Sequence, residues 1–242
     1  YRCDWSSDVC SSDLPRVLER FRHSLSRPSG MVLVTGPTGS GKTTTLYAAL
    51  NELNSTEKKV ITVEDPVEYR LGGLNQVQVH EKIDLSFSRV LRTVLRQDPD
   101  IVLIGEMRDQ ETAEIGMRAA MTGHLVLSTL HTNSSIASIS RLNDMGIEPF
   151  MTSATLNGVL AQRLLRRVCS KCAEPHLPND KMKEIFESYG LDPTRAQMQR
   201  GRGCPNCGQM GYKGRQGIYE VFKTSDTIRD MIVKQATQLE LE

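Results

Sequence analysis

The sequence predicts an α/β fold: a parallel sheet covered by helices on both faces, followed by a small cysteine-rich subdomain. Up to about residue 168, short apolar runs alternate with segments of helical periodicity. Beyond that point the chain becomes polar and carries two close pairs of cysteines. We therefore predict a first domain over 15–168, a second over 169–207, and the start of a C-terminal region, truncated within a helical segment, over 208–242.

Five segments have the character of strands, because they are short and apolar or alternate in polarity. They are 31–36, 58–65, 74–80, 100–106 and 124–131, of which 74–80 alternates as an edge strand does. Helices are predicted over 43–51, 86–97, 110–121, 134–145 and 149–167, with Asp109 as the N-cap of the third, Gly146 ending the fourth and Pro149 opening the fifth. Strands that alternate with helices indicate parallel pairing.

The composition favours a globular protein without a strong overall charge. The 242 residues are 38% hydrophobic and 24% charged, with a net charge of +1. Such a balance produces no global field that would attract nucleic acid or a membrane surface. No apolar run reaches the roughly 18 residues of a membrane span.

The first 14 residues differ from the rest of the chain. They contain the only tryptophan, Trp5, and the cysteines Cys3 and Cys10, without apolar periodicity. The stretch from Asp4 to Leu14 resembles the translation of a common DNA-sequencing adapter, so we expect it to be non-native, the natural sequence to begin near Pro15, and upstream sequence to have been lost. The alternatives are a disordered Ser/Asp-rich tail or a Cys3–Cys10 disulfide.

A glycine-rich segment, "GPTGSGKT" over 36–43, fits the pattern of a phosphate-binding loop. Its glycines allow backbone N–H groups to point toward a phosphate, Lys42 would reach the β- and γ-phosphates, and Thr43 would hold Mg²⁺. The alternative is an ordinary glycine-rich turn, but the segment lies between a predicted strand and a predicted helix, which favours nucleotide binding. The predicted phosphate-binding residues are Gly36, Pro37, Thr38, Gly39, Ser40, Gly41, Lys42, Thr43 and Thr44.

Acidic residues follow two predicted strands. Hydrolysis of ATP needs a carboxylate that positions or deprotonates water. Glu106 follows "IVLIG", and Glu64 and Asp65 end "VITVED". Ligand sites of open α/β sheets lie at the carboxyl ends of the strands, so these acids are catalytic candidates, with a solvated loop acid as the alternative for each.

Three longer stretches support a family resemblance. "ITVEDPVEYR", "RQDPDIVLIGEMRD" and "TGHLVLSTLHTN" resemble the Asp box, Walker B segment and His box of the secretion ATPase superfamily, which drives type II secretion and type IV pilus assembly. The resemblance extends from about Pro15 to the chain end. It implies a RecA-like P-loop NTPase core that works as a homo-hexamer, with Glu106 as general base, Glu64 near Mg²⁺ and the attacking water, and His131 near the γ-phosphate. One departure is Gly-Glu after the strand, where many ATPases have Asp.

The four cysteines of the second domain form two C-x-x-C pairs, "CSKC" at 169–172 and "CPNC" at 204–207. Two such pairs can present four thiolates to a structural Zn²⁺. The predicted ligands are Cys169, Cys172, Cys204 and Cys207. A redox motif and unrelated buried thiols are the alternatives. "GCPNCGQMGYKGRQGIYEV" also resembles the tetracysteine region of the type II and pilus-assembly ATPases, which pilus-retraction relatives lack.

Other polar residues carry weaker signals. His124 begins a predicted strand, and the sequence does not distinguish a structural from a functional role for it. A basic cluster, Arg163, Arg166, Arg167 and Lys171, suggests nucleic-acid binding, but no aromatic residues interleave it. A solvated face or a subunit contact is favoured instead.

The combined hypothesis is a cytoplasmic ATPase that uses ATP, Mg²⁺ and Zn²⁺ and powers type II secretion or type IV pilus assembly. By resemblance, its partners are further copies of itself and inner-membrane platform proteins, through which it would meet the inner membrane; nucleic acid is not expected as a partner. The alternatives are a nucleic-acid-translocating RecA-like ATPase and a non-catalytic nucleotide-binding scaffold. Secretion, pilus assembly and competence are not distinguished by these motifs.

Overall fold

A computed structural model of the protein describes residues 14–195 and 198–241. The predicted adapter-derived segment, with Cys3, Trp5 and Cys10, lies outside the described residues apart from Leu14. The chain divides into two compact units: the first runs up to Arg163 and resumes at Gly217, and the second is Leu164–Gln216. The C-terminal segment therefore returns to the first unit.

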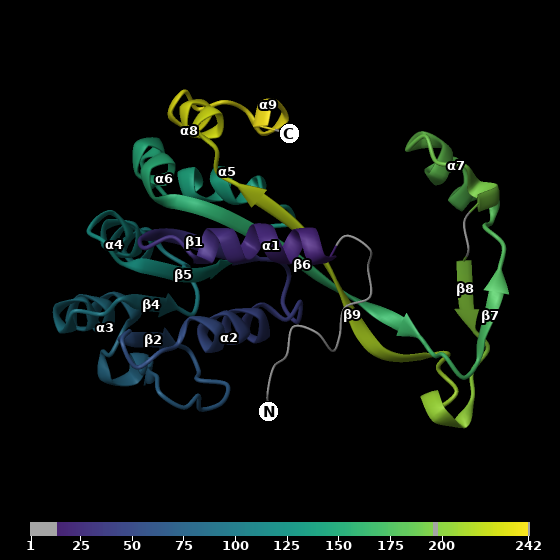
Figure 1. Ribbon diagram of the computed structural model, residues 1–242, viewed down its shortest axis with the longest axis horizontal. Helices are drawn as coiled ribbons and strands as arrows, with labels where there is room; N and C mark the ends of the chain where they lie inside the picture. Colours follow the sequence, from purple (N-terminus) through teal and green to yellow (C-terminus); the bar gives the residue numbers. More distant parts are fainter. Residues whose placement is uncertain (1–13, 196–197, 242) are drawn as a thin grey trace. The chain divides into compact units, whose positions relative to one another are not determined.

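The first unit is built on a seven-stranded sheet with the order β3-β2-β4-β5-β1-β6-β9. The strands are β1 (Gly30–Thr35), β2 (Val60–Glu64), β3 (Asn75–Gln78), β4 (Ile101–Ile104), β5 (Leu125–Leu130), β6 (Leu156–Val168) and β9 (Tyr212–Lys223). From β3 to β6 every neighbouring pair is parallel. The predicted parallel sheet is confirmed (Figure 1). The strand order places β3 at its edge.

Helices cover both faces of this sheet. Alternate residues of β1 belong to different cores: Met31 and Leu33 pack in one, and Val32 and Val34 in the other. Helices α1 (Leu14–Leu25) and α2 (Lys42–Leu53) contribute to the second core. The first core receives α3 (Phe87–Val94), α4 (Gln110–Met121), α5 (Ala137–Asp144), α6 (Pro149–Thr155), α8 (Asp226–Val233) and α9 (Gln238–Leu241). Burial on both faces explains why the inner strands are continuously apolar.

Local signals define several helix ends. The side chain of Asp109 accepts a hydrogen bond of 2.8 Å from the backbone N–H of Thr112, so it is the N-cap of α4, as predicted. Gly146 has a φ of 84° directly after α5, a conformation that glycine adopts without strain. Short 3₁₀ turns lie at Glu81–Ile83, Leu95–Gln97, Pro193–Arg195 and Pro205–Cys207.

The predicted helix over 149–167 was wrong, because α6 ends at Thr155 and β6 begins at Leu156. An apolar run of this length fits a buried strand as well as a helix, and pairing decides between them. Here Leu33 of β1 pairs with Val159 in parallel register. At Gly158 a Cβ atom would approach Ser24 Oγ to 2.6 Å, so the close packing beside β6 requires a glycine.

Among the described residues of the second unit are an antiparallel strand pair and an α-helix. Strand β7 (Ala173–His176) pairs with β8 (Met198–Gly201), two strands that the sequence analysis did not predict. Helix α7 (Asp180–Ser188) begins at the N-cap Asn179, whose side chain accepts a hydrogen bond from the N–H of Met182. None of the helices in the described part of the chain combines the length and apolar character required to cross a bilayer.

Candidate functional site: a phosphate loop beside an acidic edge, and a tetracysteine cluster

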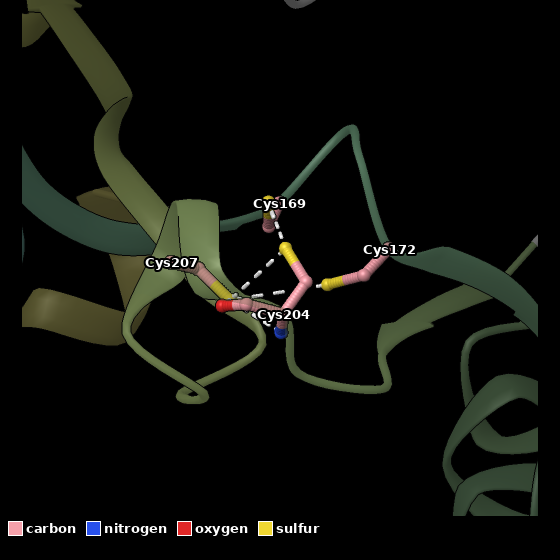
Figure 2. Close-up of side chains that lie close together, drawn as sticks. All are labelled: Cys169, Cys172, Cys204 and Cys207. Carbon is pink, nitrogen blue, oxygen red and sulfur yellow. Dashed lines mark hydrogen bonds between the residues drawn. The ribbon is translucent and has the colours of Figure 1, made fainter.

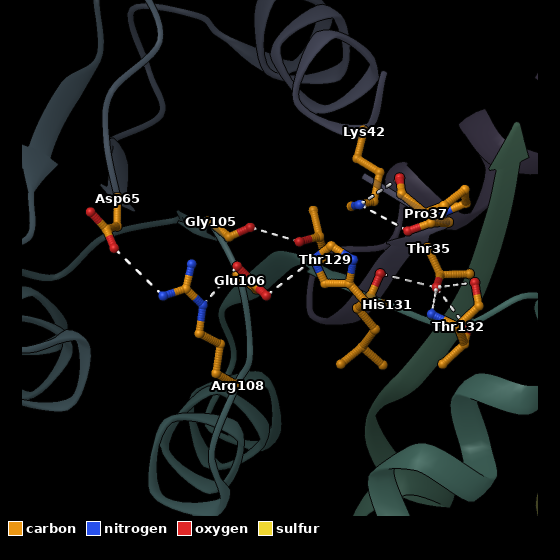
Figure 3. A network of polar contacts seen from close by, with 12 residues as sticks. Thr35, Pro37, Lys42, Asp65, Gly105, Glu106, Arg108, Thr129, His131 and Thr132 are labelled. Atoms are coloured by element: carbon orange, nitrogen blue, oxygen red, sulfur yellow. Dashed lines mark hydrogen bonds and ion pairs between the residues drawn. The ribbon is translucent and has the colours of Figure 1, made fainter. Parts of the chain in front are cut away.

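The candidate catalytic residues lie at the carboxyl edge of the sheet. Glu64 ends β2, Glu106 follows β4, His131 follows β5, and the phosphate loop follows β1. Because β2, β4, β5 and β1 are parallel neighbours in this order, their carboxyl ends lie side by side. The fold thus brings the predicted residues to one edge, where Figure 3 shows Lys42, Glu106 and His131.

The phosphate loop has the backbone that anion binding requires. Gly36, Gly39 and Gly41 have φ values of 148°, 76° and 87°, a backbone conformation that glycine adopts readily and that is typical of phosphate-binding loops. The Nζ atom of Lys42 donates to the carbonyl of Gly36 at 2.9 Å and to that of Pro37 at 3.2 Å (Figure 3). The ammonium group therefore lies within the loop, where a phosphate would also lie.

Two further observations fit a bound phosphate. The hydroxyl of Ser40 is buried and has no hydrogen-bond partner among the described residues, so its capacity to donate is unused. Burial lowers the pKa of Lys42, and the negative charge of Glu106 acts in the opposite direction. Phosphate oxygens would compensate the buried ammonium. Thr43, at the start of α2, is the loop hydroxyl available to Mg²⁺.

Glu106 has a positive or hydrogen-bonding neighbour at each carboxylate oxygen. Its Oε1 lies 3.1 Å from Nε2 of His131, and its Oε2 accepts from Nε of Arg108 at 2.9 Å (Figure 3). The hydrogen bond to Glu106 raises the pKa of Arg108, whose Nη1 also lies 3.6 Å from Asp65. Glu106 keeps 22% of its side chain exposed, so water can reach this carboxylate.

Glu64 has a different environment. It is 3% exposed, and its carboxylate accepts hydrogen bonds from the hydroxyls of Tyr47 and Thr62 and from Nε2 of Gln76 at 3.2 Å. Burial and the hydrogen bond to Glu64 raise the pKa of Tyr47 above its ordinary value. The structure thus places Glu64 at the predicted edge but holds its oxygens in a separate buried network.

The segment that follows His131 is anchored to neighbouring strands. The N–H of Thr132 donates to Oγ1 of Thr35 at 2.9 Å, and Ser135 donates through its N–H and its hydroxyl to Glu220 of β9. By contrast, Nδ1 of His124 lies 2.9 Å from the carbonyl of Ala119, at the opposite end of β5. His124 therefore has a structural role at the far edge of the sheet.

The second unit gathers all four predicted metal ligands. Their sulfur atoms lie within 4.8 Å of one another (Figure 2). The Cys169–Cys204, Cys172–Cys207 and Cys204–Cys207 separations are 3.9, 3.9 and 3.7 Å. Four thiolates around a tetrahedral Zn²⁺ with Zn–S bonds of about 2.3 Å would lie about 3.8 Å apart. The cluster can therefore bind a metal of this kind.

Hydrogen-bond donors around the cluster suit thiolates. The side chain of Asn206 donates to Cys169 at 3.4 Å. This bond, followed by the backbone hydrogen bond from Lys171, is the main cause that lowers the pKa of Cys169 to about 6. The N–H of Gly211 lies 3.2 Å from the sulfur of Cys207. Burial raises the pKa of Cys172 to about 11, so a cation is needed to hold this sulfur as a thiolate.

Sequence analysis missed two residues of the phosphate site and its neighbourhood. Arg108 was overlooked although it lies two positions after Glu106. Gln162, which donates a hydrogen bond to the phosphate loop, was not predicted because it lies within the wrongly predicted helix.

Two members of the basic cluster have partners within the chain. The guanidinium of Arg166 stacks 4.4 Å from the ring centre of Tyr212, and the guanidinium of Arg163 donates a hydrogen bond to the side chain of Asn133.

Comparisons with known proteins agree with this geometry. The Vibrio cholerae type II secretion system ATPase E is 49% identical over 224 residues, which cover 93% of this chain and 44% of that protein. The Myxococcus xanthus type IV pilus assembly ATPase PilB is 52% identical over 225 residues, which cover 92% of this chain and 39% of that protein. The chain thus spans less than half the length of these two relatives.

Among solved structures, the pilus retraction motor PilT with bound ADP superimposes with a TM-score of 0.69 and 32% identity, over 98% of this chain and 57% of that one. The profile of the family described as "Type II/IV secretion system protein" matches residues 12–242. On this evidence the chain belongs to the type II/IV secretion system protein family.

Proposed function

We propose that this chain is the ATP-hydrolysing part of a motor that powers type II protein secretion or type IV pilus assembly. One observation carries the enzymatic part of the proposal: the Glu106 carboxylate, flanked by His131 and Arg108, stands at the same sheet edge as the phosphate loop with Lys42. Intact catalytic groups argue against a purely scaffolding role.

Each residue has a proposed task in hydrolysis. The loop from Gly36 to Thr44 holds the phosphates through N–H groups, and Lys42 neutralises their charge. Thr43 would hold Mg²⁺, which polarises phosphate oxygens when bound. Glu106 orients the attacking water and accepts its proton. His131 contacts Glu106 and supplies a hydrogen-bond donor near the γ-phosphate. Glu64 would reach Mg²⁺ only by giving up one of its hydrogen bonds to Tyr47, Thr62 or Gln76.

The experiment is an isosteric substitution at the proposed base. Glu106→Gln is expected to retain Mg-ATP affinity and to lose hydrolysis, since an amide cannot accept the proton. Glu114→Gln is the matched control, because Glu114 pairs with Arg118 on the surface of α4. Phosphate release and the binding of a fluorescent ATP analogue are the two measurements. Hydrolysis at the parent rate in Glu106→Gln would assign the base elsewhere, with Glu64 the next candidate.

For the second unit we propose a structural zinc ion held by Cys169, Cys172, Cys204 and Cys207. The sulfur separations match a tetrahedral site, and the four side chains come from two segments that the ion would join. Its contribution is stability of the fold rather than catalysis.

The motor role rests on the relatives. The full-length protein is proposed to act as a homo-hexamer in the cytoplasm, at the inner face of the inner membrane, through platform proteins of that membrane. A nucleic-acid motor is the competing function. Two of the four basic residues that suggested it already have partners within the chain, Arg166 on Tyr212 and Arg163 on Asn133.

Segment exchange tests the motor role. The region from Pro15 onward replaces the matching region of the Vibrio secretion ATPase and, separately, of the Myxococcus pilus-assembly ATPase. Restored secretion or restored piliation in the corresponding deletion strain supports the proposal and tells the two systems apart. Lys42→Ala versions should restore neither. Failure of both exchanges, together with DNA-stimulated hydrolysis by the chain, would favour the nucleic-acid motor.

A further inference from the structure

A buried amide side chain connects β6 to the phosphate loop. Gln162 is 4% exposed. Its Nε2 donates to the carbonyl of Ser40 at 2.7 Å, and its Oε1 accepts from the hydroxyl of Thr45 at 2.7 Å. Ser40 belongs to the loop and Thr45 to the first turns of α2, so one side chain joins the two segments on either side of Lys42.

The backbone of the same residue also shapes the loop. A Cβ atom at Gly36 would lie 2.2 Å from the carbonyl oxygen of Gln162. The last residue of β1 pairs with Ala161 of β6, directly before Gln162. The sheet register thus places Gln162 beside the start of the loop. Its carbonyl oxygen leaves no room for a Cβ atom at position 36, which explains why Gly36 is a glycine.

These contacts require a side chain that both donates and accepts, as an amide does. The carbonyl of Ser40 can only accept, so its partner must donate, while Thr45 needs an acceptor for its hydroxyl proton. A carboxylate could serve Thr45 but not Ser40, and an aliphatic side chain could serve neither. In a dry environment each lost partner leaves a buried polar group unpaired.

We propose that Gln162 is a positioning residue of the nucleotide site, which holds the phosphate loop and the start of α2 in the conformation that accepts phosphate. It does not touch the substrate. It acts through the N–H groups of the loop, because fixing the Ser40 carbonyl fixes the peptide planes beside it. A loop already held in this way loses less entropy on binding. The inference rests on the proposed nucleotide binding.

The test compares two amide side chains of the same strand. Gln162→Met removes both hydrogen bonds at similar volume. Asn157→Leu is the matched control, because Asn157 lies at the other end of β6 and donates to the carbonyl of Ser29 at 2.9 Å. The measurements are the Kd of fluorescent Mg-ADP and the thermal midpoint of each variant. Loss of two buried hydrogen bonds at the loop should raise the Kd of Gln162→Met about tenfold or more, while Asn157→Leu keeps the parent Kd.

Two further variants separate positioning from general stability. Thr45→Val removes one of the two bonds without altering Gln162, and should raise the Kd about threefold to tenfold. Gln162→Glu keeps an acceptor for Thr45 but adds a negative charge beside the loop. It should therefore weaken Mg-ATP binding more than Gln162→Met does, by charge repulsion alone. The readout that a purely structural role would not move is the Kd: Gln162→Met and Thr45→Val should raise it, whereas Asn157→Leu should lower only the thermal midpoint.

The outcomes are distinguishable. Parent-like Kd values in folded Gln162→Met overturn the positioning role while nucleotide binding stands. If Gln162→Met does not fold, an unchanged Kd in Thr45→Val overturns it. A parent that binds Mg-ADP no better than Lys42→Ala overturns the proposed function itself, and this inference with it.

Discussion

Nε2 of His131 lies 3.1 Å from Oε1 of Glu106, although the two residues follow different strands. Neighbouring β4 and β5 hold this pair. The N–H of Met107 donates to the carbonyl of Thr129 at 3.2 Å, and the hydroxyl of Thr129 donates to the backbone carbonyl of Gly105 at 2.8 Å. The ends of both strands are thus fixed to each other directly before the catalytic candidates (Figure 3). A substitution of either residue should therefore alter the hydrogen bonding of the other.

Replacing His131 should slow hydrolysis without abolishing nucleotide binding. His131→Ala removes a donor beside Glu106, and loss of one such donor costs on the order of 10²-fold in kcat in other enzymes. His124→Ala is the control, since that histidine contacts Ala119 at the far end of the same strand. It should lower the thermal midpoint but leave kcat within about twofold of the parent. Equal kcat in the two variants would remove His131 from the mechanism.

Lys42→Ala should abolish measurable binding of Mg-ATP. The substitution removes the ammonium that occupies the loop beside Gly36 and Pro37, and with it the charge that compensates the phosphates. Lys58→Ala, at an exposed position before β2, should bind like the parent. Calorimetry with Mg-ATP checks both, and parent-like affinity in Lys42→Ala would contradict the assignment of the loop.

Tyr47→Phe should destabilise the fold, because it leaves the buried Glu64 carboxylate short of one donor. Loss of a hydrogen bond to a buried charged group costs about 1.5–3 kcal/mol of unfolding free energy. The edge-to-face contact with Tyr69, at 4.7 Å between ring centres, is retained by phenylalanine. Urea unfolding of both proteins at pH 7 measures the difference.

The same pair has a pH signature. Folding raises the pKa of Tyr47, so the neutral phenol favours the folded state below the unfolded-state pKa of about 10. This stabilisation is lost as the pH rises through and above that value, when the unfolded phenol ionises first. The unfolding free energy of the parent should therefore fall more steeply above pH 10 than that of Tyr47→Phe. Parallel pH profiles would show that Tyr47 does not carry the effect.

Much of this architecture could be predicted from local patterns. The spacing of glycines and Lys42 identifies the phosphate loop, and apolar runs identify β1, β2, β4 and β5, because both faces of these strands are buried. The placement of Glu106 beside His131 is different, since it depends on the order of β4 and β5 in the sheet. The role predicted for His131 came from the resemblance to a family, not from periodicity.

Strand β6 shows where local reasoning fails. "LNGVLAQRLLRRV" suits a helix as well as a strand, and its state is decided by pairing with β1, far away in the sequence. The error had a functional consequence. A helix would have placed Gln162 at no defined distance from the phosphate loop, whereas the strand register sets it directly beside Gly36. Residues that act through tertiary pairing leave no local signal.

Cys204→Ser should abolish the proposed zinc binding of the tetracysteine unit and leave nucleotide binding unchanged. Cys204 has sulfur neighbours at 3.9 Å and 3.7 Å, in Cys169 and Cys207, so Cys204→Ser removes a thiolate from the cluster. Structural zinc contributes on the order of 10–16 kcal/mol in small sites, far more than an open cluster of thiols. We expect about one zinc per chain in the parent and none in this variant, by elemental analysis.

The consequences should be confined to the second unit. Hydrogen exchange over 169–211 should accelerate in Cys204→Ser, whereas the Kd for Mg-ADP should stay unchanged, since the phosphate loop, Glu106, His131 and Gln162 all belong to the first unit. Ser170→Ala, between the ligands Cys169 and Cys172, is the control and should keep its zinc. Full metal occupancy in a Cys169→Ser/Cys204→Ser double variant would refute the site, because two thiolates cannot close a tetrahedral shell.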